Sequence, residues 1–108
     1  MELYEIVFIA RQDLQVQEIQ QISTQYKEDI RNVGGVLKIF EYLGLRPLSY
    51  EIKKNKKGHY LFYLLNIEPS LIKRLENKLR FREDIIKYVV FKSTRKNLDS
   101  SSIRQKLI

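Results

Sequence analysis

The side chains that could carry out catalysis are few in this chain. It has one histidine, His59, and no cysteine, which excludes thiol catalysis, disulfides and cysteine-ligated metals. No nucleophile or orienting acid stands at a recognisable spacing from His59, so the sequence does not predict a catalytic triad. A lone histidine beside Tyr60 is typical of a strand start rather than of a transition-metal site. We therefore expect no catalytic residue, no metal and no cofactor.

An anion-binding loop is the one enzymatic alternative that the residues leave open. Arg11 follows the first predicted strand, where small ferredoxin-like enzymes of the acylphosphatase kind place an arginine and an anion-cradling loop. The residues after it, Gln12-Asp13-Leu14, are not glycine-rich, and Asp13 would repel a phosphate. An acylphosphatase-like enzyme is thus the weaker alternative to a binding protein.

Basic side chains are in excess and are concentrated in one short run. The 108 residues include 20 Lys and Arg against 13 Asp and Glu, which gives a net charge of +7 and favours a polyanionic partner such as nucleic acid. The densest run is Lys53, Lys54, Lys56 and Lys57, which could neutralise phosphates. The alternative is a solvated lysine-rich turn, and a basic composition can also serve solubility alone.

Six periodic segments must position these groups. With 44% apolar and 31% charged residues, the chain has enough apolar residues for one packed core. The periodic segments follow the order strand, helix, strand, strand, helix, strand. This order predicts an α+β ferredoxin-like fold, the split βαβ pattern, with both helices on one face of a four-stranded antiparallel sheet. The predicted strands cover 3–10, 36–50, 59–67 and 85–92, the helices start near 13–16 and at 69–70, and the turn covers 53–58. We expect a single domain over 1–93 and a basic, flexible tail over 94–108.

Particular residues mark the ends and bends of these elements. Asp13 can cap the first helix, and Gly34-Gly35 can end it in a left-handed conformation. Ser70 can cap the second helix after Pro69. Gly44 and Pro47 suit a bulge or a sheet edge, so the second strand is expected to bend.

The sheet face without helices is predicted to be apolar and to bind a protein partner. The two-residue period of a strand places five apolar residues on this face, and Lys87 and Lys92 flank them in the last strand. The alternatives are tolerated surface residues or cover by the tail. RNA-recognition modules of the same strand order stack bases on aromatics after Lys-Gly, but here Tyr60 and Phe62 fall on the opposite parity to those positions, which disfavours such stacking. The five apolar residues are Leu3, Val7, Ile9, Val89 and Phe91.

The start of the chain and its apolar stretches bear on location. Met1-Glu2-Leu3 passes directly into a strand-like run without the basic and apolar regions of a signal peptide, and no apolar stretch approaches the roughly 20 residues that span a bilayer. A cytoplasmic protein is the expectation from these two observations.

Four sequence stretches together resemble the bacterial small-subunit ribosomal protein S-six family. They are Tyr4-Glu5, the stretch 41–50 that reads EYLGLRPLSY and is followed by Ile52, Lys57-Gly58-His59-Tyr60, and Arg82-Glu83-Asp84-Ile85. The resemblance covers residues 1 to about 93. The combination of the Gly-Leu-Arg stretch with the Lys-Gly-His-Tyr stretch is the specific part, since the order of elements alone occurs in many functions.

The resemblance implies a function as well as the ferredoxin-like fold. It implies a structural, non-enzymatic constituent of the small ribosomal subunit that contacts its central-domain ribosomal RNA and pairs with protein S-eighteen. Pro47 stands where the family commonly has a second basic residue, which removes one possible contact. Arg46 could bind RNA phosphate or a partner, or instead pair internally with Glu41. The candidate RNA-binding residues are Tyr4, Arg46, Lys53, Lys54, Lys56, Lys57, Lys92 and Arg95, and the candidate partner residues are Leu3, Val7, Ile9, Lys87, Val89 and Phe91.

Overall fold

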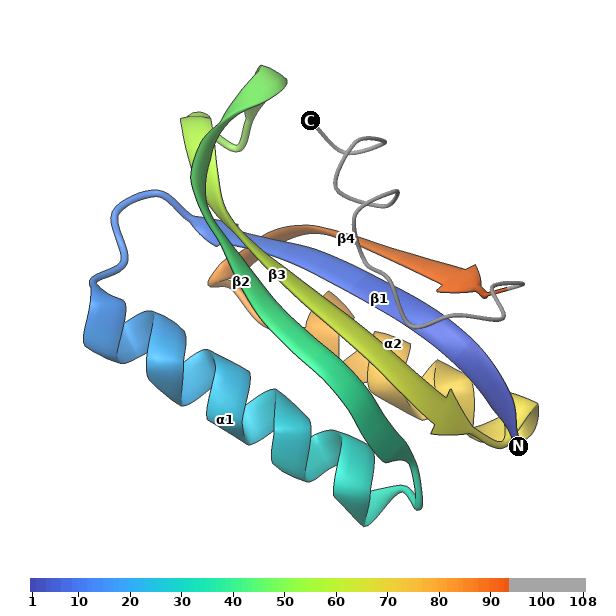
Figure 1. Ribbon diagram of the computed structural model, residues 1–108. Helices are drawn as coiled ribbons and strands as arrows, with labels where there is room; N and C mark the ends of the chain where they lie inside the picture. The colour runs from blue at the N-terminus through green and yellow to red at the C-terminus, as the bar shows by residue number, and fades with distance from the viewer. Residues whose placement is uncertain (94–108) are drawn as a thin grey trace.

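The computed structural model describes residues 1–93 and shows four strands and two α-helices (Figure 1). The predicted candidate Arg95 and the predicted tail lie outside these residues. The strands are β1 (Glu2–Arg11), β2 (Val36–Ile52), β3 (Asn55–Ile67) and β4 (Ile85–Lys92). The helices are α1 (Val16–Asn32) and α2 (Ile72–Arg80), and a 3-10 turn, Pro69–Leu71, leads into α2.

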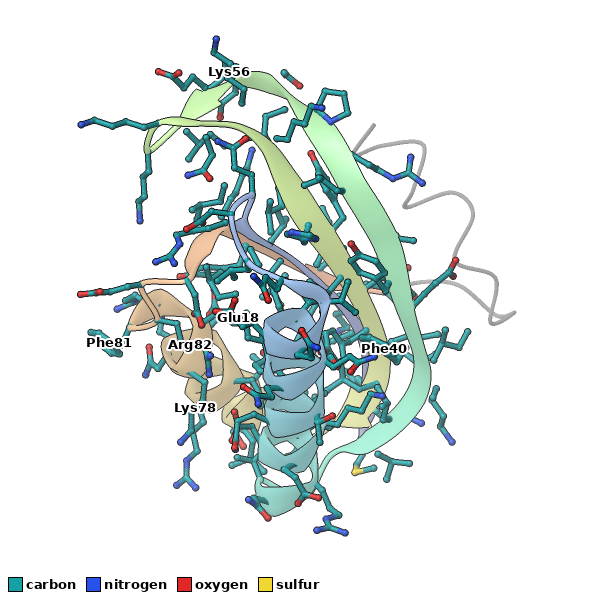
Figure 2. The ribbon with its side chains drawn as sticks, turned by 90° about the vertical axis from the view of Figure 1, so that its left-hand side faces the viewer. Glu18, Phe40, Lys56, Lys78, Phe81 and Arg82 are labelled. Atoms are coloured by element: carbon teal, nitrogen blue, oxygen red, sulfur yellow. The ribbon has the colours of Figure 1, made fainter. Side chains whose placement is uncertain are left out.

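The sheet has the strand order β2-β3-β1-β4, and all its neighbouring strands are antiparallel. Figures 1 and 2 show α1 and α2 side by side on the same face of the sheet, which we call the helix face. This arrangement confirms the predicted ferredoxin-like fold. The predicted limits of the last strand, 85–92, also agree with the structure.

The core on the helix face is built around three aromatic rings. Phe8 of β1 contacts Tyr26 of α1 and Tyr63 of β3, with ring centroids 5.2 and 5.4 Å away. The Tyr63 hydroxyl donates to the carbonyl of Ser23, and the Tyr26 hydroxyl donates to the carbonyl of Leu75 in α2. Burial raises the pKa of both tyrosines far above its ordinary value. The rings therefore join the sheet to both helices while their hydroxyl groups stay hydrogen-bonded.

The start of α1 differs from the prediction, and its end agrees with it. Asp13 does not cap the helix, since its carboxylate binds Arg11 instead. Gln15 occupies the capping position, and its backbone N–H donates to the Glu18 side chain at 3.1 Å. At the other end Gly34 has a φ of +88°, and its N–H donates to the carbonyl of Arg31. Glycine is favoured there because a side chain would strain this left-handed conformation.

The start of α2 also differs in detail. Pro69 opens the 3-10 turn as predicted, because its missing N–H costs nothing in a first turn. Ser70 lies within that turn, whereas Glu68 occupies the capping position and makes no capping hydrogen bond through its side chain. The prediction thus located the turn that leads into the helix, but the α-helix itself begins at Ile72 and Ser70 does not cap it.

The long strand β2 bends as predicted. It lies at the sheet edge, and its pairing with β3 shifts register between Tyr42 and Gly44 and again after Pro47. Gly44 has a φ of +99°, which suits a bulge and favours glycine. An edge strand tolerates Pro47 because no neighbouring strand needs its missing N–H.

A second apolar cluster lies on the sheet face opposite the helices, which we call the open face. The cluster contains Tyr60, Phe62 and Leu64 of β3 together with Val7 and Ile9 of β1. Leu48 and Ile52, from the hairpin that β2 and β3 form, are partly buried and pack against it. Bulges increase strand twist, which helps this half of β2 to bend over the sheet. The sheet thus has a core on each face, although helices cover only one.

No helix within residues 1–93 is long and apolar enough to cross a membrane.

Candidate nucleic-acid and partner interface

The basic hairpin tip, residues 53–57, is formed by a tighter turn than predicted. Only Lys53 and Lys54 form the turn, with φ values of +47° and +67°, and β3 already begins at Asn55. Two successive residues with positive φ are typical of the turn that closes a two-residue hairpin loop. The predicted six-residue turn is therefore wrong, because backbone pairing continues to Ile52 and Asn55. Lys53, Lys54, Lys56 and Lys57 are all exposed.

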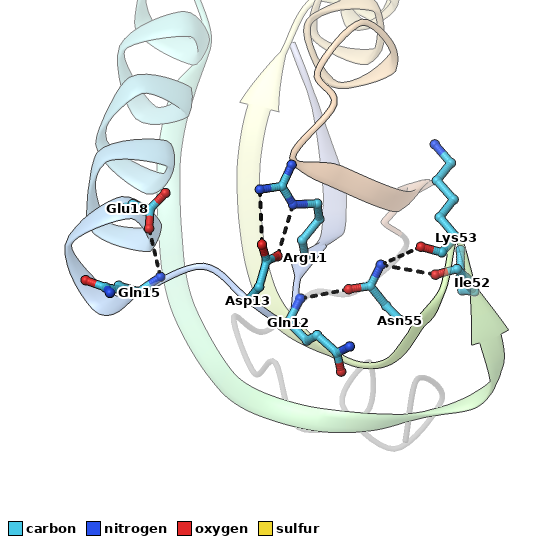
Figure 3. A network of polar contacts seen from close by, with 8 residues as sticks. All are labelled: Arg11, Gln12, Asp13, Gln15, Glu18, Ile52, Lys53 and Asn55. Atoms are coloured by element: carbon cyan, nitrogen blue, oxygen red, sulfur yellow. Dashed lines mark hydrogen bonds and ion pairs between the residues drawn. The ribbon is translucent and has the colours of Figure 1, made fainter.

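Asn55 fixes this tip to the rest of the domain (Figure 3). Its side chain is 6% exposed, and its amide nitrogen donates to the carbonyls of Ile52 and Lys53 at 3.2 and 3.0 Å. Its Oδ1 accepts from the backbone N–H of Gln12, 43 residues earlier, at 3.0 Å. The Gln12 side chain in turn accepts from the N–H of Lys57 at 3.3 Å. The four lysines therefore project from an anchored tip, although no charge run in the sequence indicates the role of Asn55.

Arg11 lies at the same end of the sheet but does not form an open anion site. Its guanidinium binds Asp13 through Nε at 3.1 Å and through Nη2 at 3.4 Å (Figure 3). A carboxylate on the guanidinium compensates the charge that an acylphosphatase-like site would need for phosphate. The structure therefore gives the enzymatic alternative no support.

The other predicted RNA-binding residues do not gather at the hairpin tip. Tyr4 is half-buried against the core of the helix face, and Lys92, its partner in β4, forms an ion pair with Glu2 at 3.1 Å. Tyr4 and Arg11 are seven positions apart in β1, a distance of about 23 Å along an extended strand. The described candidates thus lie at the tip, at the opposite end of the sheet, and in β2.

Arg46 in β2 is held by the backbone. Its Nε donates to the carbonyl of Leu43 at 2.6 Å. This hydrogen bond closes the bulge at Gly44. The guanidinium is partly exposed beside the open face, and its role in binding stays a prediction.

The open face is only partly accessible, which corrects the expectation of a bare apolar surface. Val7 and Ile9 share this face as the two-residue period predicts, but their side chains are 1% and 5% exposed within the chain itself. Leu48, Tyr50 and Ile52 of the hairpin line a small cavity of about 50 Å³ together with Val7, Ile9 and Val89. The expectation was wrong because the bent hairpin, in addition to the helices, covers part of the sheet.

Four of the predicted partner residues keep accessible surface. Phe91 is 37% exposed, Leu3 and Val89 are half-buried, and Lys87 is exposed. Strand pairing places Val89 opposite Val7, Phe91 opposite Glu5, and Lys87 opposite Ile9, so all three β4 residues belong to the open face. The Lys87 ammonium lies 5.6 Å from the centre of the Tyr50 ring. The accessible part of the candidate partner surface is therefore the β4 side of this face.

Tyr60 and Phe62 were not predicted to belong to this face. Both lie in the open-face cluster and are 4% and 0% exposed, so neither ring is available for a nucleobase to stack on. Base stacking is therefore disfavoured by their burial rather than by parity. The sequence feature that could have predicted this burial is the uninterrupted apolar run from Tyr60 to Leu65, which is typical of a strand buried on both faces.

His59 is a buried structural residue. It is 6% exposed, and its Nδ1 lies 2.8 Å from the hydroxyl of Tyr42, whose ring stacks on the imidazole. Within the part of the chain that the structure describes, no three His, Cys, Asp or Glu side chains are grouped as metal ligands would be.

An Arg82–Asp84 ion pair makes a testable contribution to stability. The guanidinium donates to both carboxylate oxygens at 2.9 and 2.7 Å, and this hydrogen bonding lowers the pKa of Asp84 below its ordinary value. Because the folded-state pKa is depressed, the stabilisation is present above the unfolded value of about 3.9 and is lost as the pH falls through the folded-state pKa.

Asp84→Asn should therefore lower the free energy of unfolding at pH 7, and its difference from the unmodified chain should shrink below about pH 4. Urea denaturation at pH 7 and pH 3 measures this. Asp13→Asn is the matched control, since Asp13 pairs with Arg11 in the same i,i+2 spacing but its side chain is 68% exposed and should contribute little. A difference for Asp84→Asn that stayed constant with pH would contradict the assignment.

Fold and surface together define a class: a small ferredoxin-like α+β domain with an anchored basic hairpin and a partly apolar open face. A family model described as ribosomal protein S6 matches residues 3–92. The chain belongs to the ribosomal protein S6 family.

Individual relatives agree with this assignment. The small ribosomal subunit protein bS6 of Granulibacter bethesdensis is 40% identical over 92 residues, which are 85% of this chain and 60% of that protein. The protein of the same name from Rickettsia canadensis is 40% identical over 93 residues, 86% of this chain and 77% of that protein. The chain thus spans about 60% of the length of the first of these relatives.

A solved structure supports the fold. The crystal structure of 30S ribosomal protein S6 from Thermotoga maritima superposes with a TM-score of 0.82 at 24% identity, covering 97% of this chain and 92% of that one. At this identity the likeness concerns the fold alone.

Proposed function

We propose that this chain is a structural, non-enzymatic constituent of the small ribosomal subunit in the cytoplasm. The match to the ribosomal protein S6 family over residues 3–92 is the observation that carries the proposal. The net charge of +7 and the exposed lysines of the anchored tip suit contact with ribosomal RNA. Arg11, bound to Asp13, offers no comparable support for a phosphatase.

We further propose that the chain binds central-domain ribosomal RNA together with protein S-eighteen. The lysines of the basic tip and the accessible β4 residues Val89 and Phe91 come from different strands, so the chain offers separate groups to RNA and to a protein partner. Phosphate contacts by flexible lysines position a protein on RNA without reading its sequence. Shared recognition with a second protein would supply the missing specificity.

Filter binding to central-domain RNA, with and without protein S-eighteen, tests this proposal. Weak binding of the chain alone and much tighter binding with the partner are expected. A Lys53→Gln, Lys54→Gln double variant should weaken RNA binding several-fold and flatten its salt dependence, because two phosphate contacts are lost. Equal affinity with and without the partner would count against shared recognition.

The matched control for that variant is Lys38→Gln, Lys73→Gln. Both control residues are exposed and lie away from the tip, and the net charge falls by the same amount. Equal weakening by the two double variants would show diffuse attraction and not a contact at the tip.

A further inference from the structure

A broad groove lies between α1 and α2, on the side of the helices that faces away from the sheet. Its cavity volume is about 740 Å³, within the range of ligand-binding clefts. Gln25 and Asp29 of α1 line one wall, and Arg74, Asn77 and Lys78 of α2 line the other. Neither the predicted RNA-binding residues nor the predicted partner residues belong to it.

An exposed aromatic ring stands at the end of this groove. Phe81 follows directly after the last residue of α2 and is 78% exposed, the highest exposure among the large apolar residues described. Figure 2 shows it projecting outward from the α2 end, away from the sheet. A ring in this position contributes little to the core, but it offers a flat face to a planar ligand.

The charge of the groove is unevenly compensated. Arg74 and Lys78 are exposed, lie on successive turns of α2, and take part in none of the ion pairs between residues 1–93. The only acidic residue among the described residues that line the groove is Asp29. Arg82 also lines it, but its positive charge is compensated by Asp84. The groove therefore favours an anionic ligand over a cationic one.

The combination of groups favours single-stranded nucleic acid over an acidic peptide. The Gln25 side-chain oxygen, whose amide nitrogen donates to Asp29, can accept a hydrogen bond from a base edge, an exposed ring can stack on a base, and unpaired cations can contact phosphates. A peptide would instead need a continuous apolar floor, and Phe81 and Val33 are the only apolar residues that line the groove within the described part of the chain.

We propose that the groove between α1 and α2 binds single-stranded RNA, with a base on Phe81 and phosphates near Arg74 and Lys78. This site goes beyond the proposed function, because it is separate from the hairpin tip and from the open face. Figure 2 shows Lys56 at the tip far from Phe81 and Lys78 beside α2. The chain could then hold a single-stranded segment while its other surfaces contact structured RNA and a protein.

The test is fluorescence anisotropy of a labelled single-stranded oligouridylate, titrated with the full chain at low salt. Phe81→Ala should weaken binding at least about fivefold, in line with the loss of one stacked base. Tyr50→Ala, which removes a 63% exposed ring from the open face, is the matched control and should leave the affinity within about twofold. Exposed positions are chosen so that the variants fold.

Neighbouring cations on α2 provide a second matched pair. Arg74→Gln should weaken binding about twofold or more, because one phosphate contact is lost. Lys73→Gln removes the same charge from the adjacent residue, which pairs with Glu76 and does not line the groove, and should have a smaller effect. Lys38→Gln removes a charge from β2, outside both the groove and the hairpin tip, and should leave the affinity within about twofold.

Three results would overturn the proposal: no binding of the oligouridylate, equal weakening by Phe81→Ala and Tyr50→Ala, or equal weakening by Arg74→Gln and Lys73→Gln. Preferential binding of an oligoglutamate peptide that depends on Phe81 would assign the groove to an acidic protein segment and would likewise contradict an RNA site.

Discussion

Leu75→Ala should lower the free energy of unfolding by about 2–5 kcal/mol, the usual cost of truncating a fully buried leucine. Leu75 is 0% exposed and belongs to the core between α2 and the sheet. Phe91→Ala removes a larger side chain but should cost much less stability, because Phe91 is 37% exposed in the free chain. Urea denaturation of the two variants measures the order.

The effects on partner binding should be reversed. Burial of apolar surface contributes about 25 cal/mol per Å², so a docked Phe91 ring can supply a large part of an interface hot spot. Phe91→Ala should weaken association with protein S-eighteen at least about tenfold, equivalent to about 1.4 kcal/mol. Folded Leu75→Ala should bind almost normally. If Phe91→Ala unfolds the free chain and leaves affinity unchanged, the ring serves the core and the proposed partner surface is wrong.

Asn55→Ala should destabilise the chain by about 2 kcal/mol or more, a large effect for a polar residue in a hairpin. Three hydrogen bonds are lost, and the carbonyls and the N–H that Asn55 now satisfies are left partly buried without that partner. The tip should also lose its attachment to the segment after β1. Hydrogen exchange of the Gln12 amide, together with urea denaturation, reports both consequences.

Asn32→Ala is the matched control for this change. Asn32 is exposed at the end of α1, so its replacement should leave stability within about 0.5 kcal/mol. Stability of Asn55→Ala equal to that of the control, with unchanged protection of the Gln12 amide, would mean that backbone pairing alone holds the tip.

Much of the fold could be predicted because each element carries its own periodic signal. Ile22, Tyr26 and Ile30 recur at helical spacing and are all buried in α1. The details that failed are local but carry weak sequence signals. Gln15 is an uncommon capping residue, although its backbone N–H donates to Glu18 three residues later, and the turn at Lys53 and Lys54 lacks the glycine or asparagine that usually marks two successive positive φ values.

The candidate site was predicted only in part because its groups are held by contacts between distant segments. Its lysines are evident as a charge run, but their anchor, Asn55, bonds to Gln12 across 43 residues. Strand parity placed Val7 correctly on the open face, yet could not show that the bent hairpin packs against that face. The groove beside Phe81 arises from two helices packed side by side, and each helix alone shows only an ordinary polar surface.

Sedimentation with small ribosomal subunits tests whether the chain is a constituent of that subunit. Subunits reconstituted without their own protein of this family are mixed with the chain and centrifuged through a gradient at raised salt, which screens non-specific attraction. We expect the chain to move with the subunit in about one copy and to be displaced by an unlabelled excess of itself. Release of the chain from the subunit at the same low salt concentration as an unrelated protein of equal positive charge would contradict its role as a subunit constituent.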